Sequence, residues 1–180
     1  LPGSLVDHIV SEDLALEAAL ATGDVAACLF EPALTNIGIV LPEPGYHESV
    51  RALCTKYGAL LVIDETHTIS AGPGGCTKAW GLDPDIVTIG KTLGAGIASG
   101  AYGMTERVRA MILQHTDAKN ADVGGIGGTL AGNALSLAAM RATLGEVMTD
   151  AAFDGMIALG ERFEQGVRGV IESRELPWHV

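Results

Sequence analysis

Two residues of this chain, Asp64 and Lys91, carry side chains that could perform acid–base and carbonyl chemistry together. Asp64 ends the apolar run 60–63, and Lys91 follows the strand-like run 85–89 after a single glycine. Short runs of this kind, rich in β-branched residues, indicate strands buried in a parallel sheet. Ligands of such sheets bind beyond the carboxyl ends of the strands. We therefore expect Asp64 and Lys91 to face one crevice.

A carboxylate and a primary amine in one crevice suit an enzyme that uses pyridoxal phosphate. The lysine amine can form an imine with the cofactor aldehyde, and the carboxylate can keep the ring nitrogen protonated. Desolvation next to a buried strand would lower the pKa of Lys91 and leave more neutral amine for attack. Taken singly, each residue also has a structural interpretation, with Asp64 salt-bridged in the sheet and Lys91 on a surface loop.

Two nucleotide-binding motifs are incomplete in this region. The segment 90–92, Gly-Lys-Thr, matches the end of a P-loop, but the first glycine of that motif would fall at Asp85, in a predicted strand. The segment 94–96, Gly-Ala-Gly, would need a further glycine at the position of Ser99 to complete a dinucleotide fingerprint. A P-loop ATPase and a nicotinamide enzyme are therefore disfavoured.

Four other side chains are of types that can bind ligands or react. Thr129 follows two glycines and precedes a predicted helix, so its hydroxyl could bind an anion at the helix N-terminus or simply cap the helix. His67 and His115 have no partners at metal-ligand spacing, and we expect no metal site. Cys76 has no accompanying histidine and is interpreted as a packing residue.

Length, composition and net charge limit the classes of protein to which this chain can belong. The chain has 180 residues, 48% of them hydrophobic, and a formal net charge of −11. Such a charge argues against a nucleic acid or an anionic membrane as partner. No apolar run has transmembrane length, no signal peptide is evident, and three cysteines without metal spacing favour reduced thiols in the cytoplasm. The first residue is not Met and the end at Val180 is abrupt, so we expect an internal piece of a longer protein.

Strand-like and helical segments alternate, which predicts an α/β fold with a mostly parallel sheet flanked by helices. The expected strands cover 25–30, 59–63, 85–89 and 98–103. Helices are expected at 11–21, 46–57 and 106–113, after Thr129 and around 156–170. Residues 70–78 are expected to form a glycine-rich loop. The apolar residues of the second helix share one face, and Gly58 should cap its end.

Taken in order, these segments resemble the class III aminotransferases, a pyridoxal phosphate family of fold type I. The resemblance runs from Phe30-Glu31-Pro32 through 57–65 and 81–91 to 101–103 and 128–133, with the lysine 27 positions after the acid. It is closest to the glutamate-1-semialdehyde aminomutase branch, through the stretches 31–40 and 128–133. It implies an enzyme that moves an amino group between an amino acid or amine and a keto acid or aldehyde. An aminomutase, the intramolecular version, would use the same residues and stays open.

The resemblance also implies roles for single residues. Lys91 corresponds to the lysine that forms the Schiff base and later shuttles a proton, and Asp64 to the carboxylate on the pyridine nitrogen. Thr129 corresponds to the threonine that binds the cofactor phosphate of the neighbouring subunit, which implies a homodimer. Thr66 stands where the family usually has a valine that packs on the ring. His67 falls near the ring's phenolic oxygen.

Two further residues, Glu31 and Asn36, match positions that border the site in the aminomutase branch. Residues 1–150 correspond to the C-terminal half of the cofactor-binding large domain, and residues 151–180 to a helix that leads toward a missing small C-terminal domain. We expect the isolated chain to be inactive and aggregation-prone, because its sheet would have unpaired edges. A degenerate, non-catalytic module is the remaining alternative, and the intact pair of lysine and acid argues against it.

Overall fold

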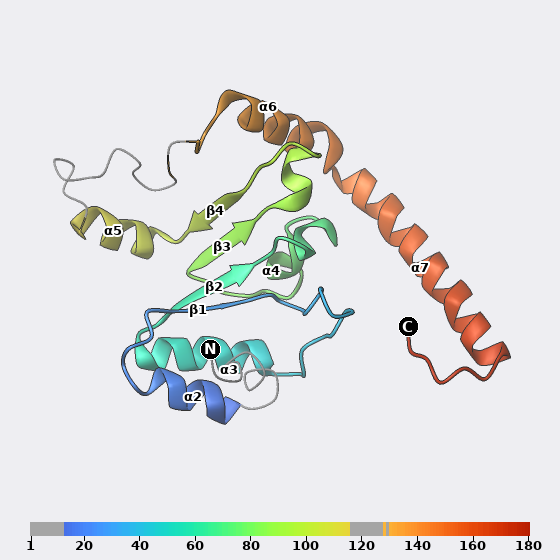
Figure 1. The fold of residues 1–180 in the computed structure, drawn as a ribbon, viewed down its shortest axis with the longest axis horizontal. Coiled ribbons are helices and arrows are strands. Elements are labelled where there is room, and N and C mark those ends of the chain that lie inside the picture. The colour runs from blue at the N-terminus through green and yellow to red at the C-terminus, as the bar shows by residue number, and fades with distance from the viewer. Residues whose placement is uncertain (1–12, 116–127, 129) are drawn as a thin grey trace.

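The structure, a computed structural model, describes residues 13–115, 128 and 130–180. Four strands form one sheet in chain order: β1 (Ala27–Phe30), β2 (Leu60–Asp64), β3 (Ile86–Ile89) and β4 (Ala101–Met104). The first three strands are parallel, and β4 pairs with β3 in the antiparallel sense (Figure 1). The predicted α/β class with a mostly parallel sheet is confirmed.

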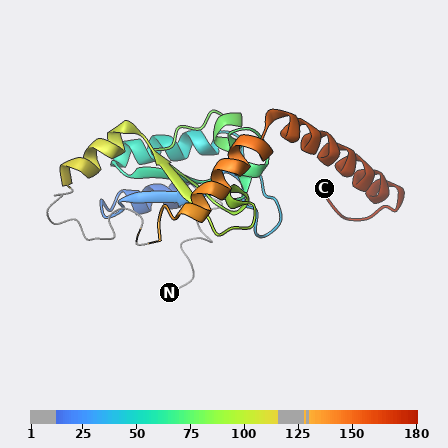
Figure 2. The same cartoon turned by 90° about the horizontal axis from the view of Figure 1, so that it is seen from above.

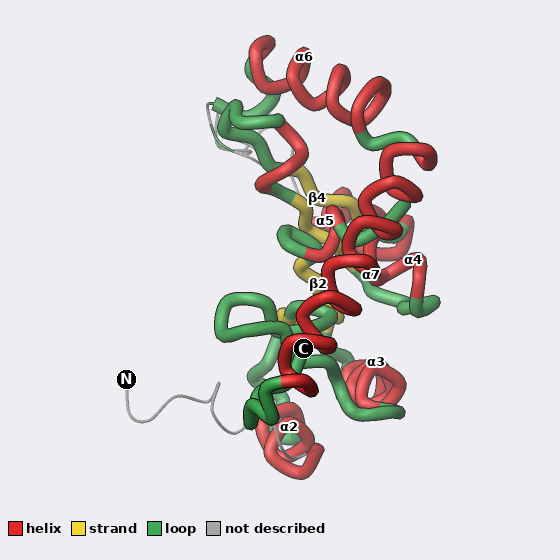
Figure 3. The backbone as a smooth tube through the Cα atoms, turned by 90° about the vertical axis from the view of Figure 1, so that its right-hand side faces the viewer, coloured by secondary structure: helices red, strands yellow, loops and turns green. Residues whose placement is uncertain are grey.

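Helices connect and flank these strands. In the described residues they are α2 (Asp13–Leu20), α3 (Tyr46–Tyr57), α4 (Gly75–Ala79), α5 (Glu106–His115), α6 (Ala134–Ala142) and α7 (Asp150–Ser173), with short 3₁₀ turns η1 (Thr68–Ser70) and η2 (Lys91–Gly94) and a π-helical turn η3 (Thr143–Val147). The strands lie between the pair α2 and α3 on one side and α6 on the other (Figure 3). Helix α7 extends away from the sheet (Figure 2).

The core of the sheet lies under α2 and α3. Val50 and Cys54 of α3 are at most 1% exposed and pack with Leu61 of β2 and Leu20 of α2. This confirms the apolar face predicted for α3. The helix ends as predicted at Gly58, whose left-handed backbone (φ 73°) lets its N–H reach the carbonyls of the last turn.

Helix α4 begins at Gly75, within the segment 70–78 that is predicted as a glycine-rich loop, which corrects the prediction. The side chain of Glu65, only 1% exposed, accepts hydrogen bonds from the backbone N–H groups of Cys76 and Thr77 at the start of α4. A carboxylate at this position accepts hydrogen bonds from the free N–H groups of the first turn, and its negative charge interacts favourably with the helix dipole. Gly75 makes room for it, since a Cβ there would clash with a Glu65 oxygen. A side chain ten positions upstream therefore starts this helix.

The predicted helix after Thr129 is interrupted. The regular helix α6 ends at Ala142, and the chain passes through the π-helical turn η3 before α7 begins behind its cap, Thr149. Large apolar side chains of α7 stay exposed, with Leu159, Phe163 and Val170 between 56% and 72% exposed. No helix in the described part of the chain is both long and apolar enough to cross a bilayer. The start of α7 falls at the boundary predicted at residue 150, and the division into domains stays a prediction.

A buried carboxylate, Asp85, ties the amino end of β3 to three neighbours. It accepts hydrogen bonds from the Leu61 backbone N–H (2.9 Å), the Arg51 guanidinium (2.9 Å) and the Arg107 guanidinium (2.6 Å). Burial alone would raise the pKa of this carboxyl. The Leu61 N–H and the two guanidinium groups outweigh burial and lower the pKa to about 2.

We predict that Asp85→Asn lowers the stability of the full-length protein by about 2 kcal/mol at pH 7, because two charge-assisted hydrogen bonds are lost. The folded-state pKa lies below the unfolded value of 3.8, so the stabilisation is fully present above that value. It is lost as the pH falls toward about 2. Denaturation measured from pH 7 downward should therefore show the gap between variant and wild type closing. Asp83→Asn, an exposed neighbour, is the control, and equal losses in both variants would contradict the prediction.

Candidate active site

The two residues predicted to do chemistry lie at the same edge of the sheet. Asp64 is the last residue of β2, and Lys91 follows β3 after the buried Gly90. The strands are parallel neighbours, with Asp64 in register with Thr88. Their arrows in Figure 1 both point toward the region where α6 meets α7. The structure therefore brings the acid and the lysine to one side of the molecule.

The carboxylate of Asp64 is half-buried and held by hydrogen bonds. Its Oδ1 accepts from the Thr66 backbone N–H at 2.8 Å, and the hydroxyls of Thr66 and Thr88 also donate to the carboxylate. Burial alone would raise the pKa of Asp64. These hydrogen bonds and the positive charge of Lys91 outweigh burial and hold the pKa below its ordinary value of 3.8. Asp64 is therefore an anion at neutral pH.

Thr88 is a site residue that the sequence analysis missed. It lies within β3, so nothing in its local pattern distinguishes it from a residue that only fills the sheet. Its role follows from the register between β2 and β3, which pairs Thr88 with Asp64. Side chains paired across neighbouring strands point to the same face of the sheet. Thr66, the second threonine at Asp64, lies against Gly90: a Cβ at that glycine would be 3.4 Å from the Thr66 methyl group.

Lys91 is exposed in this structure, which corrects the expectation that it is desolvated. It lies beyond the end of β3, and none of the described segments covers it. Its backbone is left-handed, with φ at 46°, a conformation that is unfavourable for any residue with a Cβ. A strained backbone at the start of η2 thus positions the lysine, and its amine stays accessible to solvent.

His67 lies just after Asp64 and is half-buried. Its ring Nε2 is shielded from solvent and has no hydrogen-bond partner in the described part of the chain. A buried, unsatisfied ring nitrogen is costly unless a ligand completes it. Glu31 follows β1 and accepts a hydrogen bond from the Thr35 hydroxyl, and Asn36 is exposed in the next loop. Thr129, the predicted phosphate ligand, lies outside the described residues.

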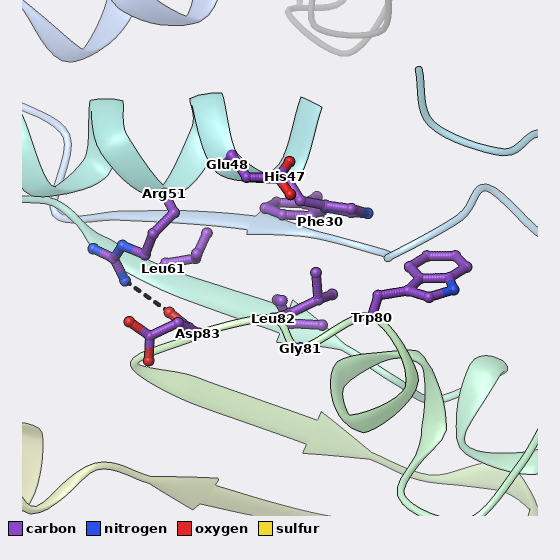
Figure 4. A pocket seen from close by; sticks show the side chains of 10 residues that line it. Phe30, His47, Glu48, Arg51, Leu61, Trp80, Gly81, Leu82 and Asp83 are labelled. Carbon is purple, nitrogen blue, oxygen red and sulfur yellow. Dashed lines mark hydrogen bonds between the residues drawn. The ribbon is translucent and has the colours of Figure 1, made fainter. Parts of the chain in front are cut away.

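A separate cleft of about 130 Å³ lies between α3 and the turn that follows α4 (Figure 4). None of the predicted site residues lines it. Its arginine, Arg51, is engaged with Asp85 and with the carbonyl of Asp83. His47 stacks on Phe30 with 5.6 Å between ring centroids. The cleft offers neither a free guanidinium for a phosphate nor an amine for an aldehyde.

Within 13–115, 128 and 130–180, no three His, Cys, Asp or Glu side chains are grouped to hold a metal ion. Burial raises the pKa of the Cys76 thiol, and the charge of Glu65 raises it further, which disfavours the reactive thiolate.

The groups at the sheet edge fit pyridoxal phosphate. An ionised carboxylate suits a protonated pyridine nitrogen, an accessible amine suits the aldehyde, and the unpartnered Nε2 of His67 suits a phenolic oxygen. All three come from two neighbouring strand ends.

Comparison with known proteins points the same way. A family model for class-III aminotransferases matches residues 6–177. A glutamate-1-semialdehyde 2,1-aminomutase from Desulfovibrio desulfuricans is 38% identical over 156 residues, which is 85% of this chain and 35% of that protein. The crystal structure of a glutamate-1-semialdehyde aminomutase from Pseudomonas aeruginosa PAO1 in complex with PMP is 47% identical, with a TM-score of 0.88, over 94% of this chain and 38% of that one.

A β-phenylalanine aminotransferase from Variovorax paradoxus is more distant, at 28% identity and a TM-score of 0.72 over 86% of this chain and 35% of that one. The chain spans about a third of the length of these relatives. With a family match over nearly all of its residues, the chain belongs to the class III aminotransferases.

Proposed function

We propose that this chain forms part of a pyridoxal phosphate-dependent aminotransferase, in which Lys91 holds the cofactor covalently and Asp64 contacts its pyridine nitrogen. One observation carries the proposal: an ionised, half-buried carboxylate and an accessible lysine end neighbouring parallel strands, close enough for the lysine charge to lower the pKa of the acid. The cofactor, when bound, supplies an electron sink for the electrons left when a substrate C–H bond breaks.

The side chains of this chain would bind the cofactor and move the substrate proton. Asp64, which stays an anion because three hydrogen bonds stabilise its charge, would hold a proton on the ring nitrogen. Lys91 would bind the aldehyde carbon and, once displaced by a substrate amine, would take and return the substrate proton at Nζ. His67 would hydrogen-bond the phenolic oxygen through Nε2, and Thr66 would pack beside the ring with its methyl group.

The amino group would pass between an amino acid or amine and a keto acid or aldehyde. An aminomutase of the glutamate-1-semialdehyde type is the second candidate. The sequence comparisons favour it, since the relative of that name from P. aeruginosa is 47% identical and the β-phenylalanine aminotransferase only 28%. Both reactions would use Lys91 and Asp64 in the same roles.

The proposal extends to the assembly. We propose a cytoplasmic homodimer in which Thr129 binds the cofactor phosphate of the neighbouring subunit, with small-molecule amino donors and acceptors as its ligands. Three side chains of the loop after β1 support an interface, because Ile37, Ile39 and Leu41 are 66–78% exposed. Apolar groups exposed together usually mark a surface that another part of the protein or another subunit covers.

Lys91 should be the single point of cofactor attachment. After the full-length protein is incubated with pyridoxal phosphate and reduced with borohydride, peptide mapping should place the label on Lys91. Lys91→Ala should lose the label and lower turnover by about a thousandfold or more, because the nucleophile is gone. Lys56→Arg, an exposed exchange in α3, should change neither. A label on Lys56, Lys78 or Lys119 would refute the assignment.

Asp64→Asn should keep the cofactor attached but lower kcat about a hundredfold or more, because a neutral amide cannot hold the ring nitrogen protonated. The pH dependence of the absorbance of the bound cofactor should shift with it. Asp64→Glu, which keeps the negative charge, should retain more activity than the amide. Full activity with an unchanged absorbance profile in Asp64→Asn would show that the carboxylate does not contact the ring.

Product analysis separates the two candidate reactions. A transaminase needs an added keto acid or aldehyde to complete its cycle, whereas an aminomutase returns the amino group to the same carbon skeleton. Turnover of glutamate 1-semialdehyde without any added acceptor would establish the mutase reaction. Strict dependence on a second substrate would establish the transaminase.

A further inference from the structure

The loop that carries Lys91 is joined to α6 by a partly buried hydrogen bond. The hydroxyl of Ser136, a residue 8% exposed, donates to the carbonyl oxygen of Ala98 at 2.8 Å. Ala98 lies between η2 and β4, seven residues after Lys91. The two segments are far apart in sequence, and α6 packs directly against η2.

The Ser136 hydroxyl is oriented by Asn133, the N-cap of α6. Asn133 accepts the Ser136 backbone N–H through Oδ1 at 3.0 Å, and its Nδ2 donates to the Ser136 Oγ at 3.0 Å. Because the hydroxyl oxygen already accepts from the amide, its own hydrogen is directed to Ala98. Nδ2 also reaches the carbonyl of Leu130 at 3.2 Å. One amide therefore fixes both the start of α6 and the donor that holds the lysine loop.

The loop needs such an anchor because its backbone is strained. Lys91 and Ala95 both have positive φ angles, 46° and 48°, and such residues persist only where the surroundings enforce them. Within the loop, Gly94 packs closely on Ser99, and a Cβ at Gly94 would clash with the Ser99 hydroxyl. Among the described residues, the Ser136 hydroxyl gives this loop a side-chain hydrogen bond from a separate helix, α6.

We propose that Ser136, set by Asn133, is a positioning residue that holds the Lys91 loop through the Ala98 carbonyl. We call the hydrogen bond from Ser136 to Ala98, with Asn133 behind it, the clamp. The clamp rests on the contacts above, and only its purpose, the placement of Lys91 for the cofactor, rests on the proposed function. Two variants test it in the full-length protein. Ser136→Ala removes the donor. Asn133→Asp keeps the helix cap but removes the amide, so that the Ser136 hydroxyl turns to the new carboxylate.

Hydrogen exchange of the backbone, measured without added cofactor, is the first readout. Both variants should exchange about three to ten times faster than wild type across residues 91–99, as expected for the loss of one hydrogen bond, while α3 stays unchanged. Ser173→Ala is the matched control, since that hydroxyl donates to a carbonyl of its own helix, that of Val170. Exchange at the wild-type rate in 91–99, or equal acceleration across α3, would overturn the clamp.

Titration with pyridoxal phosphate is the second readout. The affinity of Ser136→Ala should fall several-fold, and the pH dependence of its bound-cofactor absorbance should shift, because Lys91 is less well placed. Faster exchange with unchanged affinity and absorbance would overturn the positioning role. Failure of the wild-type protein to bind the cofactor on Lys91 would instead refute the proposed function, and the exchange data would still decide the clamp.

Discussion

The register between β2 and β3 is the constraint on which the site depends. It pairs Asp64 with Thr88, and the Glu65 N–H donates to the Thr88 carbonyl at 2.8 Å just past the end of β2. A slip by one residue would turn Asp64 to the opposite face of the sheet and remove the Thr88 hydroxyl from its carboxylate. It would also shift the Lys91 loop along the edge. The geometry of the candidate site therefore depends on a backbone alignment that no single site residue controls.

Buried carboxylates lie at both ends of this pair of strands, and the one at the amino end links them directly. At the amino end of β3, Asp85 exchanges hydrogen bonds with Leu61: its backbone N–H donates to the Leu61 carbonyl, and its carboxylate accepts the Leu61 N–H. At the carboxyl end, Glu65 is fully engaged with the start of α4. The charge of Asp85 is balanced by two guanidinium groups and that of Glu65 by helix N–H groups, whereas Asp64 has hydroxyls, one N–H and the more distant charge of Lys91. The proposed contact with a protonated ring nitrogen would give Asp64 a further charged partner.

The sequence pattern predicted those features that depend on interactions between residues close together in the chain. The three parallel strands, the apolar face of α3 and its Gly58 cap follow from side-chain spacing and from glycine's freedom at positive φ, and all three are found within a few residues of the prediction. Helix α4 could not be predicted in this way, because its first N–H groups are satisfied by Glu65, a side chain from another element. Thr88 was missed for the same reason, since its role exists only once β2 and β3 are in register.

The exposure of Lys91 to solvent could not be predicted from the local sequence pattern. The flanking strand and glycines predicted a desolvated lysine, but desolvation requires a covering segment, and the described chain offers none at that place. What the chain does supply is strain, with two non-glycine residues of one short loop held at positive φ. A glycine would relieve the strain at position 91, yet it would remove the amine. Strain retained where glycine would be easier is expected at a position that needs its side chain. The charge of this side chain also lowers the pKa of Asp64, the acid that the sequence pattern pairs with Lys91.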